Sequence, residues 1–268
     1  MTAHERLKNR MDELQIYAKK SLGQNFLISD HVIDKIIDAT VGFNCSRVVE
    51  VGPGCGALTD ILREKYTELI LVELDRNFID FWKSQNLEVI EGDALRIPWE
   101  FAKGRILVSN LPYQISASLL IERSLDHEPL VGMVLMFQKE VAQRIRASCQ
   151  SDHYGMLSVI AQEFWSIETV CDAGPRDFKP PPKVASRVLK FSPRPSAVKD
   201  HSNYLTFVKT CFQQRRRVLS NNLLGLKKEN FEINRLQDWF GINEKSEKVR
   251  AEELSPPELS SLYHFLKV

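Results

Sequence analysis

The feature that most constrains this fold is a regular alternation of short apolar runs with segments of helical spacing. Each apolar run is rich in Val, Ile or Leu, and the runs cover residues 47–51, 69–73, 87–91, 106–110 and 131–137. Segments of helical spacing lie between them, at residues 57–66, 76–83, 116–125 and 139–147. Nearly continuous apolar strands that alternate with helices are typical of a parallel sheet covered on both faces. We therefore predict a doubly wound, Rossmann-like α/β domain.

The last third of the chain follows a different pattern. Two more strand-like stretches, 167–171 and 186–191, flank a turn of three prolines and could pair as an antiparallel edge of the sheet. A Pro-Arg-Pro-Ser sequence follows and is typical of a linker; beyond it the patterns are helical, at residues 204–212, 216–224, 230–240 and 257–266. We predict a sheet domain over residues 1–195, with no role assigned to residues 1–18, and a small helical domain over residues 196–268.

Composition narrows the class of protein. Hydrophobic residues make up 43% of the 268 residues and charged residues 26%, as in soluble globular domains. No apolar run approaches the roughly 18 residues of a membrane span. The N-terminus has no apolar signal region, and the five cysteines form no Cys-x-x-Cys pair. We expect a cytoplasmic protein with reduced thiols and no membrane attachment, and because its six histidines show no ligand spacing, no metal.

The overall net charge of +1 hides a strongly basic segment. Residues 176–228 contain thirteen Lys or Arg and two acids, a net charge of +11, so the remainder of the chain carries −10. A bias of this length is typical of a surface that binds a polyanion, whereas a shorter charge run is more often a solvated face. The residues that we expect to contact phosphates are Lys209, Arg215, Arg216, Arg217 and Lys227. Alternatively, some of the three arginines pack the helical domain against the sheet domain.

A glycine-rich loop follows the first strand of the alternating series. Gly52 and Gly54 lie in the sequence Gly-Pro-Gly-Cys-Gly-Ala, directly before a helical segment. Glycine lets the backbone turn tightly and approach a ligand closely. Glu73 ends the next strand 21 residues after Gly52, where its carboxylate can accept hydrogen bonds from ribose hydroxyls. The loop predicts a nucleotide-like cofactor, and because it also fits the dinucleotide pattern with Ala57 in the last position, a nicotinamide enzyme stays open.

Further polar side chains follow the next two strands. Asp93 lies just beyond the strand at 87–91 and could accept a hydrogen bond from an adenine amino group, and Asn110 ends the strand at 106–110. In open parallel sheets, ligands bind outside the carboxyl ends of the strands. We therefore expect Glu73, Asp93 and Asn110 to converge on one site.

The sequence Asn110-Leu111-Pro112-Tyr113 favours methyl transfer to an adenine amino nitrogen. The lone pair of that nitrogen is delocalised into the ring, so two acceptors facing its N–H bonds would make it a better nucleophile. The Asn110 side-chain oxygen and the Leu111 carbonyl can be those acceptors, because Pro112 restricts the preceding residue to extended conformations. Tyr113 offers a flat face on which a base can stack. No general base is needed before attack, since the nitrogen can lose its proton after it gains the methyl group.

Seven short motifs occur in order from about residue 20 to the C-terminal helices. They are Gln24-Asn25-Phe26-Leu27, the segment from Glu50 to Thr59, Glu73-Leu74-Asp75, Gly92-Asp93-Ala94, Asn110-Leu111-Pro112-Tyr113, the segment from Phe178 to Val184, and Gln214-Arg215-Arg216-Arg217. As an ordered set they resemble the bacterial ribosomal RNA adenine dimethyltransferases, the kasugamycin-resistance methylase family. The resemblance implies S-adenosyl-L-methionine as methyl donor. It also implies N6 dimethylation of two adjacent adenosines in the 3′-terminal hairpin loop of small-subunit rRNA, within pre-30S particles, by a cytoplasmic monomer.

The resemblance also assigns roles by motif position. It implies that the cofactor is held by Asn25, Leu27, Gly52, Gly54, Glu73, Asp93 and Asn110. It implies a catalytic site of Asn110, Leu111, Pro112 and Tyr113, with Phe178 closing the target-base pocket opposite Tyr113. Selectivity for the RNA would come from its folded shape, because phosphate contacts carry little sequence information.

Three other functions stay open. A methylase of large-subunit rRNA, of the macrolide-resistance type, shares the fold and most motifs; Leu111, where that relative commonly has Ile, and residues 178–184 favour the small-subunit enzyme. A nicotinamide oxidoreductase would leave residues 110–113 without a task. A non-catalytic RNA-binding assembly factor would have no need of an intact cofactor loop.

Overall fold

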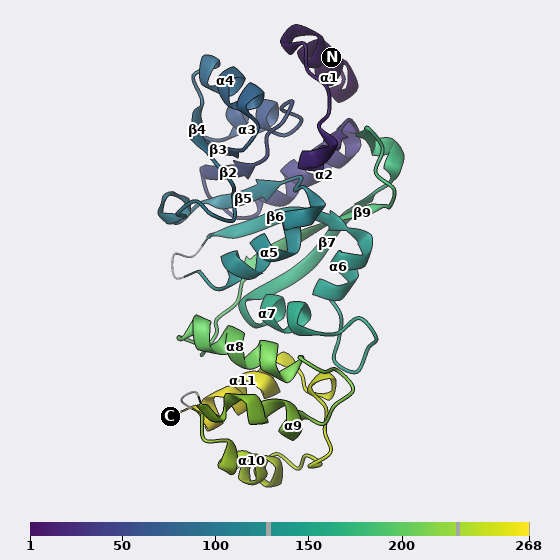
Figure 1. The fold of residues 1–268 in the computed structure, drawn as a ribbon. Coiled ribbons are helices and arrows are strands. Elements are labelled where there is room, and N and C mark those ends of the chain that lie inside the picture. Colours follow the sequence, from purple (N-terminus) through teal and green to yellow (C-terminus); the bar gives the residue numbers. More distant parts are fainter. Residues whose placement is uncertain (127–129, 229–230, 268) are drawn as a thin grey trace. The chain divides into compact units, whose positions relative to one another are not determined.

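The chain divides into two compact units in a computed structural model that describes residues 1–126, 130–228 and 231–267. The sheet unit comprises Met1–Ala142 and Ser166–Pro193, and the helical unit comprises Gln143–Trp165 and Arg194–Val268 (Figure 1). The predicted boundary after residue 195 lies two residues from the division after Pro193. The segment Gln143–Trp165 also belongs to the helical unit by its contacts. The sequence had placed this segment in the sheet domain.

In the described residues the sheet unit contains a seven-stranded sheet with the order β4-β3-β2-β5-β6-β9-β7. Its strands are β2 (Arg47–Val51), β3 (Glu68–Glu73), β4 (Glu88–Glu91), β5 (Ile106–Ser109), β6 (Gly132–Gln138), β7 (Trp165–Ala173) and β9 (Ser186–Pro193). The pairs from β4 through β6 are parallel, and β9 runs antiparallel to β6. The predicted doubly wound α/β fold is therefore confirmed, and β9 supplies its antiparallel side.

Burial explains why the apolar runs became strands. Val48 and Val49 of β2 and all residues from Met133 to Phe137 of β6 are fully buried, so these strands need apolar side chains on both faces. The strand order changes direction at β2, which has β3 on one side and β5 on the other. The connections leave this point in opposite directions, so the carboxyl ends of β2 and β5 border a crevice, where ligands of such sheets bind.

Helices and short turns complete the sheet unit. They are α1 (Ala3–Leu14), α2 (Asp30–Val41), α3 (Thr59–Lys65), α4 (Arg76–Ser84), α5 (Tyr113–Ser124) and the 3-10 turns η1 (Lys20–Leu22), η2 (Glu100–Ala102) and η3 (Pro175–Asp177). Helix α6 (Lys139–Ile145) begins in this unit and ends in the helical unit. A separate antiparallel pair joins β1 (Phe26–Leu27) to β8 (Phe178–Lys179). No helix was predicted at α1 or α2, although Ile33, Ile36 and Ile37 of α2 have helical spacing.

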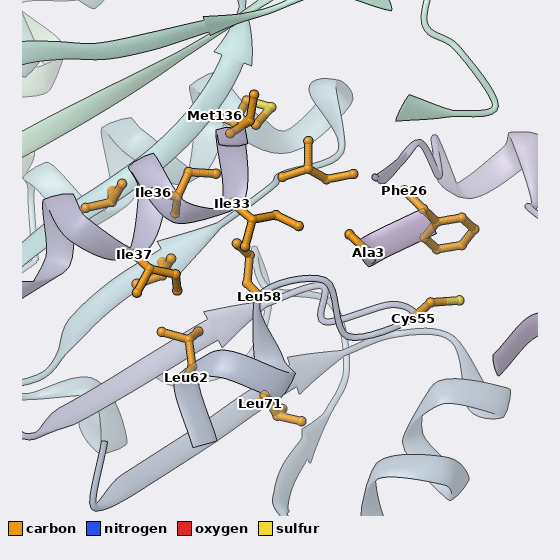
Figure 2. Close-up of a cluster of buried hydrophobic side chains, with 14 of the residues drawn as sticks. Ala3, Phe26, Ile33, Ile36, Ile37, Cys55, Leu58, Leu62, Leu71 and Met136 are labelled. Atoms are coloured by element: carbon orange, nitrogen blue, oxygen red, sulfur yellow. The ribbon is translucent and has the colours of Figure 1, made fainter. Parts of the chain in front are cut away.

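Those α2 residues form part of the main hydrophobic core. Ile33, Ile36 and Ile37 lie together with Leu58 and Leu62, which follow the glycine loop (Figure 2). All five side chains are at most 2% exposed. The core therefore anchors the segment after the glycine loop against α2, and holds the loop at the edge of the sheet.

The helical unit contains α7 (Met156–Phe164), α8 (His201–Cys211), α9 (Leu219–Leu223), α10 (Leu236–Ile242), α11 (Pro256–Leu266) and the turns η4 (Leu224–Lys228), η5 (Ile233–Arg235) and η6 (Ala251–Glu253). Tyr263 of α11 packs edge-on against Tyr204 and Phe207 of α8, with ring centroids 5.1 and 5.6 Å apart. Of the helix predicted at 230–240, residue 230 lies outside the described residues, Phe231 and Glu232 are not helical, and η5 and the start of α10 occupy residues 233–240.

The predicted helix at 216–224 is wrong at its N-terminal end. Residues 216–218 lie in the loop between α8 and α9, and α9 begins only at Leu219. The buried Asn222 side chain donates hydrogen bonds to the carbonyls of Cys211 and Gln214, at 2.8 and 3.2 Å. The last carbonyls of a helix have no partner within that helix. The Asn222 side chain supplies a donor to one at the end of α8 and to another at the start of the loop.

Candidate active site

A cavity lies at the carboxyl ends of β2, β3, β4 and β5. Of the residues predicted to hold a cofactor or do chemistry, it is lined by Asn25, Leu27, Gly52, Gly54, Glu73, Asp93, Asn110, Leu111, Pro112 and Tyr113. The parallel strands bring these residues together, although they are spread over 89 positions of the sequence. Phe178 is not among the lining residues.

The glycine loop needs its glycines for both backbone and space. Gly52, Gly54 and Gly56 have φ values of +67, +48 and +80°, a region that other residues rarely adopt. A Cβ on Gly54 would lie 2.9 Å from the Phe26 ring, and one on Gly56 would collide with the Trp82 ring at 2.6 Å. The loop is therefore packed closely by two aromatic rings, of which Phe26 also lines the cavity and Trp82 does not.

Glu73 is a buried carboxylate held by backbone donors. Its Oε1 accepts hydrogen bonds from the N–H groups of Leu74 and Asp75, at 2.7 and 2.8 Å, and its Oε2 receives the longer bond from the Gly54 N–H, at 3.4 Å. Burial raises the pKa of Glu73 although these donors oppose the shift. Since Oε1 is fully used locally, Oε2 is the oxygen better able to accept from a ligand hydroxyl.

Asp93 lies in the loop that follows β4. Its Oδ1 caps the next turn by accepting from the Leu95 N–H at 3.0 Å, and its Oδ2 lies 3.4 Å from the exposed guanidinium of Arg96. The loop is held beside β3 by the Gly92 N–H, which donates to the Glu73 carbonyl at 2.8 Å. Asp93 and Glu73 therefore border the same end of the cavity.

Asn110 has a defined orientation. Its Nδ2 donates to the Asn25 carbonyl at 3.0 Å, which places its Oδ1 on the other side of the amide. The neighbouring Ser109 hydroxyl donates to the Val51 carbonyl and so ties the end of β5 to the end of β2. Asn110 is thereby fixed both to the glycine-loop strand and to the segment before β1.

Tyr113 is fixed at both ends of its side chain. Tyr113 is the first residue of α5. It directly follows Pro112, whose φ of −55° and ψ of 128° are not helical, so the extended backbone after β5 ends at Pro112. The predicted start of this helix at residue 116 is therefore three residues too late, because Pro112 caps it. The Tyr113 hydroxyl lies 2.7 Å from the Ser186 hydroxyl of β9. Burial raises the pKa of the Tyr113 hydroxyl, so this side chain stays protonated and neutral.

Phe178 is buried next to a residue that lines the cavity. Its side chain is 3% exposed, belongs to the main hydrophobic core and sits opposite Leu27 in the β1–β8 pair. Leu27 does line the cavity. The sequence-based role of Phe178 as a wall opposite Tyr113 stays a prediction, and its position gives it a direct means of supporting Leu27.

Sequence reasoning missed several residues at the cavity. Glu50 of β2 is 2% exposed, its Oε2 accepts from the Thr59 hydroxyl at 2.7 Å, and burial raises the pKa of Glu50 to about 8. Its place in the motif before the glycine loop was the available signal. Ala3, Arg6 and Leu7 of α1 also line the cavity, in a segment to which the sequence analysis assigned no role.

Two hydrogen bonds hold the segment of residues 19–24 before β1. Asp75 caps α4 and accepts from the Lys19 ammonium at 2.7 Å and from the Gln24 amide at 3.0 Å. Burial acts against the charged form, but these bonds outweigh it and lower the pKa of Asp75. The segment from Lys19 to Gln24 is thus attached to the same strand end that carries Glu73.

The expected phosphate contacts differ in their surroundings. Arg215 donates to the Asp152 carbonyl at 3.0 Å and pairs with Glu252 at 3.1 Å, both inside the helical unit. Within the described part of the chain, the exposed Arg216 and Arg217 side chains make no hydrogen bond or ion pair. Lys209 is exposed on α8, and Lys227 lies in η4, where its side chain is outside the description.

Two kinds of feature are absent from the described ranges. No helix there is long and apolar enough to cross a membrane. The same ranges contain no group of three or more His, Cys, Asp or Glu side chains placed to hold a metal ion.

The chain is similar to proteins of one family over nearly its whole length. The model of the family described as ribosomal RNA adenine dimethylase matches residues 16–264. The ribosomal RNA small subunit methyltransferase A of Bdellovibrio bacteriovorus is 54% identical over 268 residues, 98% of each chain. The protein of the same name from Chlorobaculum tepidum is 40% identical over 94% of this chain and 90% of its own.

Solved structures agree with this result. A dimethyladenosine transferase from Plasmodium falciparum has a TM-score of 0.73 and 26% identity, and the match covers 88% of this chain and 95% of that one. The 23S rRNA methyltransferase ErmE matches 90% of this chain and 99% of its own with a TM-score of 0.65, which at 22% identity shows a shared fold. From the family match and the identities, this chain belongs to the ribosomal RNA adenine dimethylase family.

Proposed function

We propose that this protein transfers methyl groups from S-adenosyl-L-methionine to N6 of two adjacent adenosines in the 3′-terminal hairpin loop of small-subunit rRNA. The observation that carries the proposal is the convergence of the glycine loop, two strand-end carboxylates and residues 110–113 on one cavity in a chain of this family. The protein would act in the cytoplasm, as a monomer, on pre-30S particles. The names of the relatives in Bdellovibrio and Chlorobaculum favour the small subunit over the large one.

The residues of the cavity fit the proposed cofactor. Glu73 Oε2 has remaining capacity to accept from ribose hydroxyls, and Asp93 can accept from an adenine amino group at the same end of the cavity. Asn25, Leu27, Gly52, Gly54 and Asn110 complete the set that would hold the cofactor. When bound, S-adenosyl-L-methionine supplies a methyl group attached to a positively charged sulfur.

The chain's own part in the chemistry is to orient the target amine. The Asn110 Oδ1 and the Leu111 carbonyl would accept from its two N–H bonds, which favours a tetrahedral nitrogen with its lone pair directed at the methyl group. The bond from Asn110 to Asn25 supports this role, because it fixes which end of the amide is the acceptor. The proton leaves after transfer, so no catalytic base is required.

Tyr113 would bind the target base. An adenosine must leave its stack to reach the cavity, at a cost of a few kcal/mol, and stacking on an aromatic ring returns about 1–3 kcal/mol. The Ser186 contact supports this role because it holds the ring in place before the base arrives. Phe178 would close the target-base pocket opposite Tyr113, and its pairing with the cavity-lining Leu27 supports a contribution to the shape of that pocket.

The helical unit would supply phosphate contacts. Arg216, Arg217 and Lys209 are exposed and suited to bind RNA, with an affinity that falls steeply with salt. Arg215 is engaged with Asp152 and Glu252, which supports a structural role for this member of the triplet. Lys227 of η4 would be a further contact to the RNA phosphates.

Incubation of the protein with tritiated S-adenosyl-L-methionine and unmethylated 30S subunits, beside 50S subunits, tests the function. We expect label in the 3′-terminal hairpin of the small-subunit rRNA only, and dimethyladenosine after digestion. Label in the large subunit would identify the macrolide-resistance type of activity. Binding of 30S subunits without label would identify the non-catalytic assembly factor.

A further inference from the structure

Helix α1 forms a wall of the cofactor cavity, although it lies outside the residues that match the family model. Its N-cap Thr2 and Glu5 form a reciprocal capping box that starts the helix. Ala3 and Leu7, one turn apart, are each 3% exposed, and both line the cavity. Figure 2 shows Ala3 in the same cluster as Phe26 and Cys55, beside the glycine loop.

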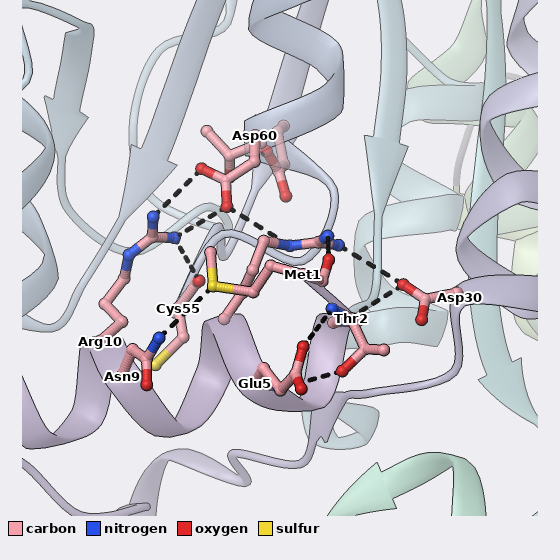
Figure 3. Close-up of polar contacts among 12 residues, drawn as sticks. Met1, Thr2, Glu5, Asn9, Arg10, Asp30, Cys55 and Asp60 are labelled. Carbon is pink, nitrogen blue, oxygen red and sulfur yellow. Dashed lines mark hydrogen bonds and ion pairs between the residues drawn. The ribbon is translucent and has the colours of Figure 1, made fainter.

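Arg10, on the next turn of α1, holds the glycine loop directly. Its Nη1 donates to the Cys55 carbonyl at 2.5 Å, and its two terminal nitrogens contact both carboxylate oxygens of Asp60 at 3.1 and 3.2 Å (Figure 3). The guanidinium also lies 4.9 Å from the ring centroids of Phe81 and Trp82. The Arg10 and Asp60 side chains are only 17% and 14% exposed, so water screens this pair less than a surface pair.

These contacts fix two successive peptide units of the loop. Arg10 holds the Cys55 carbonyl, and the Trp82 indole N–H donates to the preceding carbonyl, that of Gly54, at 3.0 Å. In a trans peptide the N–H points opposite to the C=O, so fixing a carbonyl also fixes the direction of the next N–H. A Cβ on Gly56 would collide with both Arg10 and Trp82, which shows how closely these side chains cover the loop.

A second set of contacts holds the start of the helix. The Ala3 N–H donates to Asp30 at 2.9 Å, and the Arg6 guanidinium lies 3.7 Å from Asp30 and 3.8 Å from Asp60. Asp60 therefore faces both arginines of α1. The helix is attached by charge to the segment that follows the glycine loop, and by Ala3 and Leu7 to the core beneath it.

We propose that Arg10 is a positioning residue for the cofactor loop, and that α1 retains the bound cofactor by closing one side of its cavity. The inference rests on the proposed function only in taking S-adenosyl-L-methionine and its product as the ligands. Arg10 does not touch the reacting atoms; it acts through the Cys55 carbonyl and Asp60.

The test compares Arg10→Ala with Lys8→Ala, an exposed lysine of the same helix, in the full-length protein. Binding of S-adenosylhomocysteine is measured by calorimetry, its dissociation rate by stopped flow, and thermal unfolding with and without it. We expect Arg10→Ala to weaken binding about tenfold, mainly through faster dissociation, and Lys8→Ala to match the wild type. With unmethylated 30S subunits, Arg10→Ala should raise KM for S-adenosyl-L-methionine and leave kcat within about twofold.

Arg10→Lys keeps the positive charge but loses the two-pronged contact with Asp60, so a smaller weakening of the same kind is expected, and this variant serves if Arg10→Ala does not fold. An unchanged affinity of Arg10→Ala for S-adenosylhomocysteine, with only a lower Tm, would overturn the inference and leave the proposed function intact. The same result for Arg10→Lys decides the test if Arg10→Ala does not fold. A wild-type protein that binds no S-adenosylhomocysteine would overturn both.

Discussion

At the scale of single residues, Asn110 shows how a local contact defines a chemical role. The Asn25 carbonyl takes one end of its amide, so the acceptor oxygen has one orientation before any ligand binds. Such fixed acceptors are most useful when the target has two N–H bonds to satisfy. After the first methylation the amine has only one N–H bond. The two transfers therefore depend differently on the two acceptors, the Asn110 Oδ1 and the Leu111 carbonyl.

We expect Asn110→Ala to depress the second methyl transfer more strongly than the first, because N6-methyladenine has a single N–H bond to offer to the acceptors of the site. The measurement is the ratio of mono- to dimethyladenosine in digested rRNA, which should rise. Asn77→Ala, an exposed asparagine on α4, is the matched control. A ratio equal to that of the wild type, at any overall rate, would contradict this account of the site.

Glu50 makes a separate prediction about pH. Folding raises its pKa from 4.5 to about 8 through burial, so the folded protein keeps a proton that the unfolded chain releases. Its contribution to stability is therefore fully present below about pH 4.5 and is lost as the pH rises towards 8. Since one pKa unit corresponds to about 1.4 kcal/mol, the loss is of the order of a few kcal/mol.

Glu50→Gln cannot ionise and can still accept from Thr59. We expect it to flatten the fall in stability between pH 5 and pH 8, and to be more stable than the wild type at pH 8. Urea unfolding midpoints at several pH values provide the measurement, with Glu88→Gln on the surface of β4 as control. Parallel curves for wild type and Glu50→Gln would show that the Glu50 carboxyl is not protonated in the fold.

At the scale of elements, the loop between α8 and α9 divides the arginine triplet into two tasks. The Asn222 side chain holds the loop from inside, Arg215 pairs within the helical unit, and Arg216 and Arg217 extend into solvent. The sequence predicted a helix over residues 216–224, which would have placed Arg216 and Arg217 in its first turn. In the loop both arginines are instead exposed, and neither side chain has a hydrogen bond or ion pair to the residues that the structure describes.

We expect Arg216→Glu combined with Arg217→Glu to weaken binding to 30S subunits and to reduce the slope of log affinity against log salt by about 2, with the Tm unchanged. Arg215→Ala should instead lower the Tm and change the salt slope little. Filter binding over a salt series and calorimetric unfolding give the two readouts. A lower Tm in the double variant, with an unchanged slope, would assign these arginines to packing.

At the scale of the whole molecule, the basic segment of residues 176–228 is divided between the sheet unit and the helical unit. Its first part lies in the sheet unit, where Arg187 and Lys139 pair with Asp172 at 2.6 and 2.9 Å and lower the pKa of Asp172 to about 2. Charge counted along the sequence therefore overstates what is free to bind RNA. The cofactor cavity, in contrast, is built entirely from the sheet unit.

A ligand confined to one unit stabilises that unit. We expect S-adenosylhomocysteine to slow amide hydrogen exchange in α1, in the glycine loop and around residues 73–75, 92–94 and 110–113, and to leave α8 to α11 unchanged. Exchange measured by mass spectrometry with and without the ligand provides the comparison. Equal protection across the helical unit would contradict a site built from the sheet unit alone.

The sequence by itself determined the strands, the glycine loop and the polar residues at the strand ends. These follow from short-range physics: an apolar run must be buried, a positive φ needs glycine, and parallel strands bring their carboxyl ends to one edge. Only the tertiary structure decided that Arg10 of α1 binds the Cys55 carbonyl of the glycine loop, that Asn25 orients Asn110, and that Arg215 is engaged internally. Those partners are 45, 85 and 63 residues apart, and no local pattern encodes which distant carbonyl a side chain will reach.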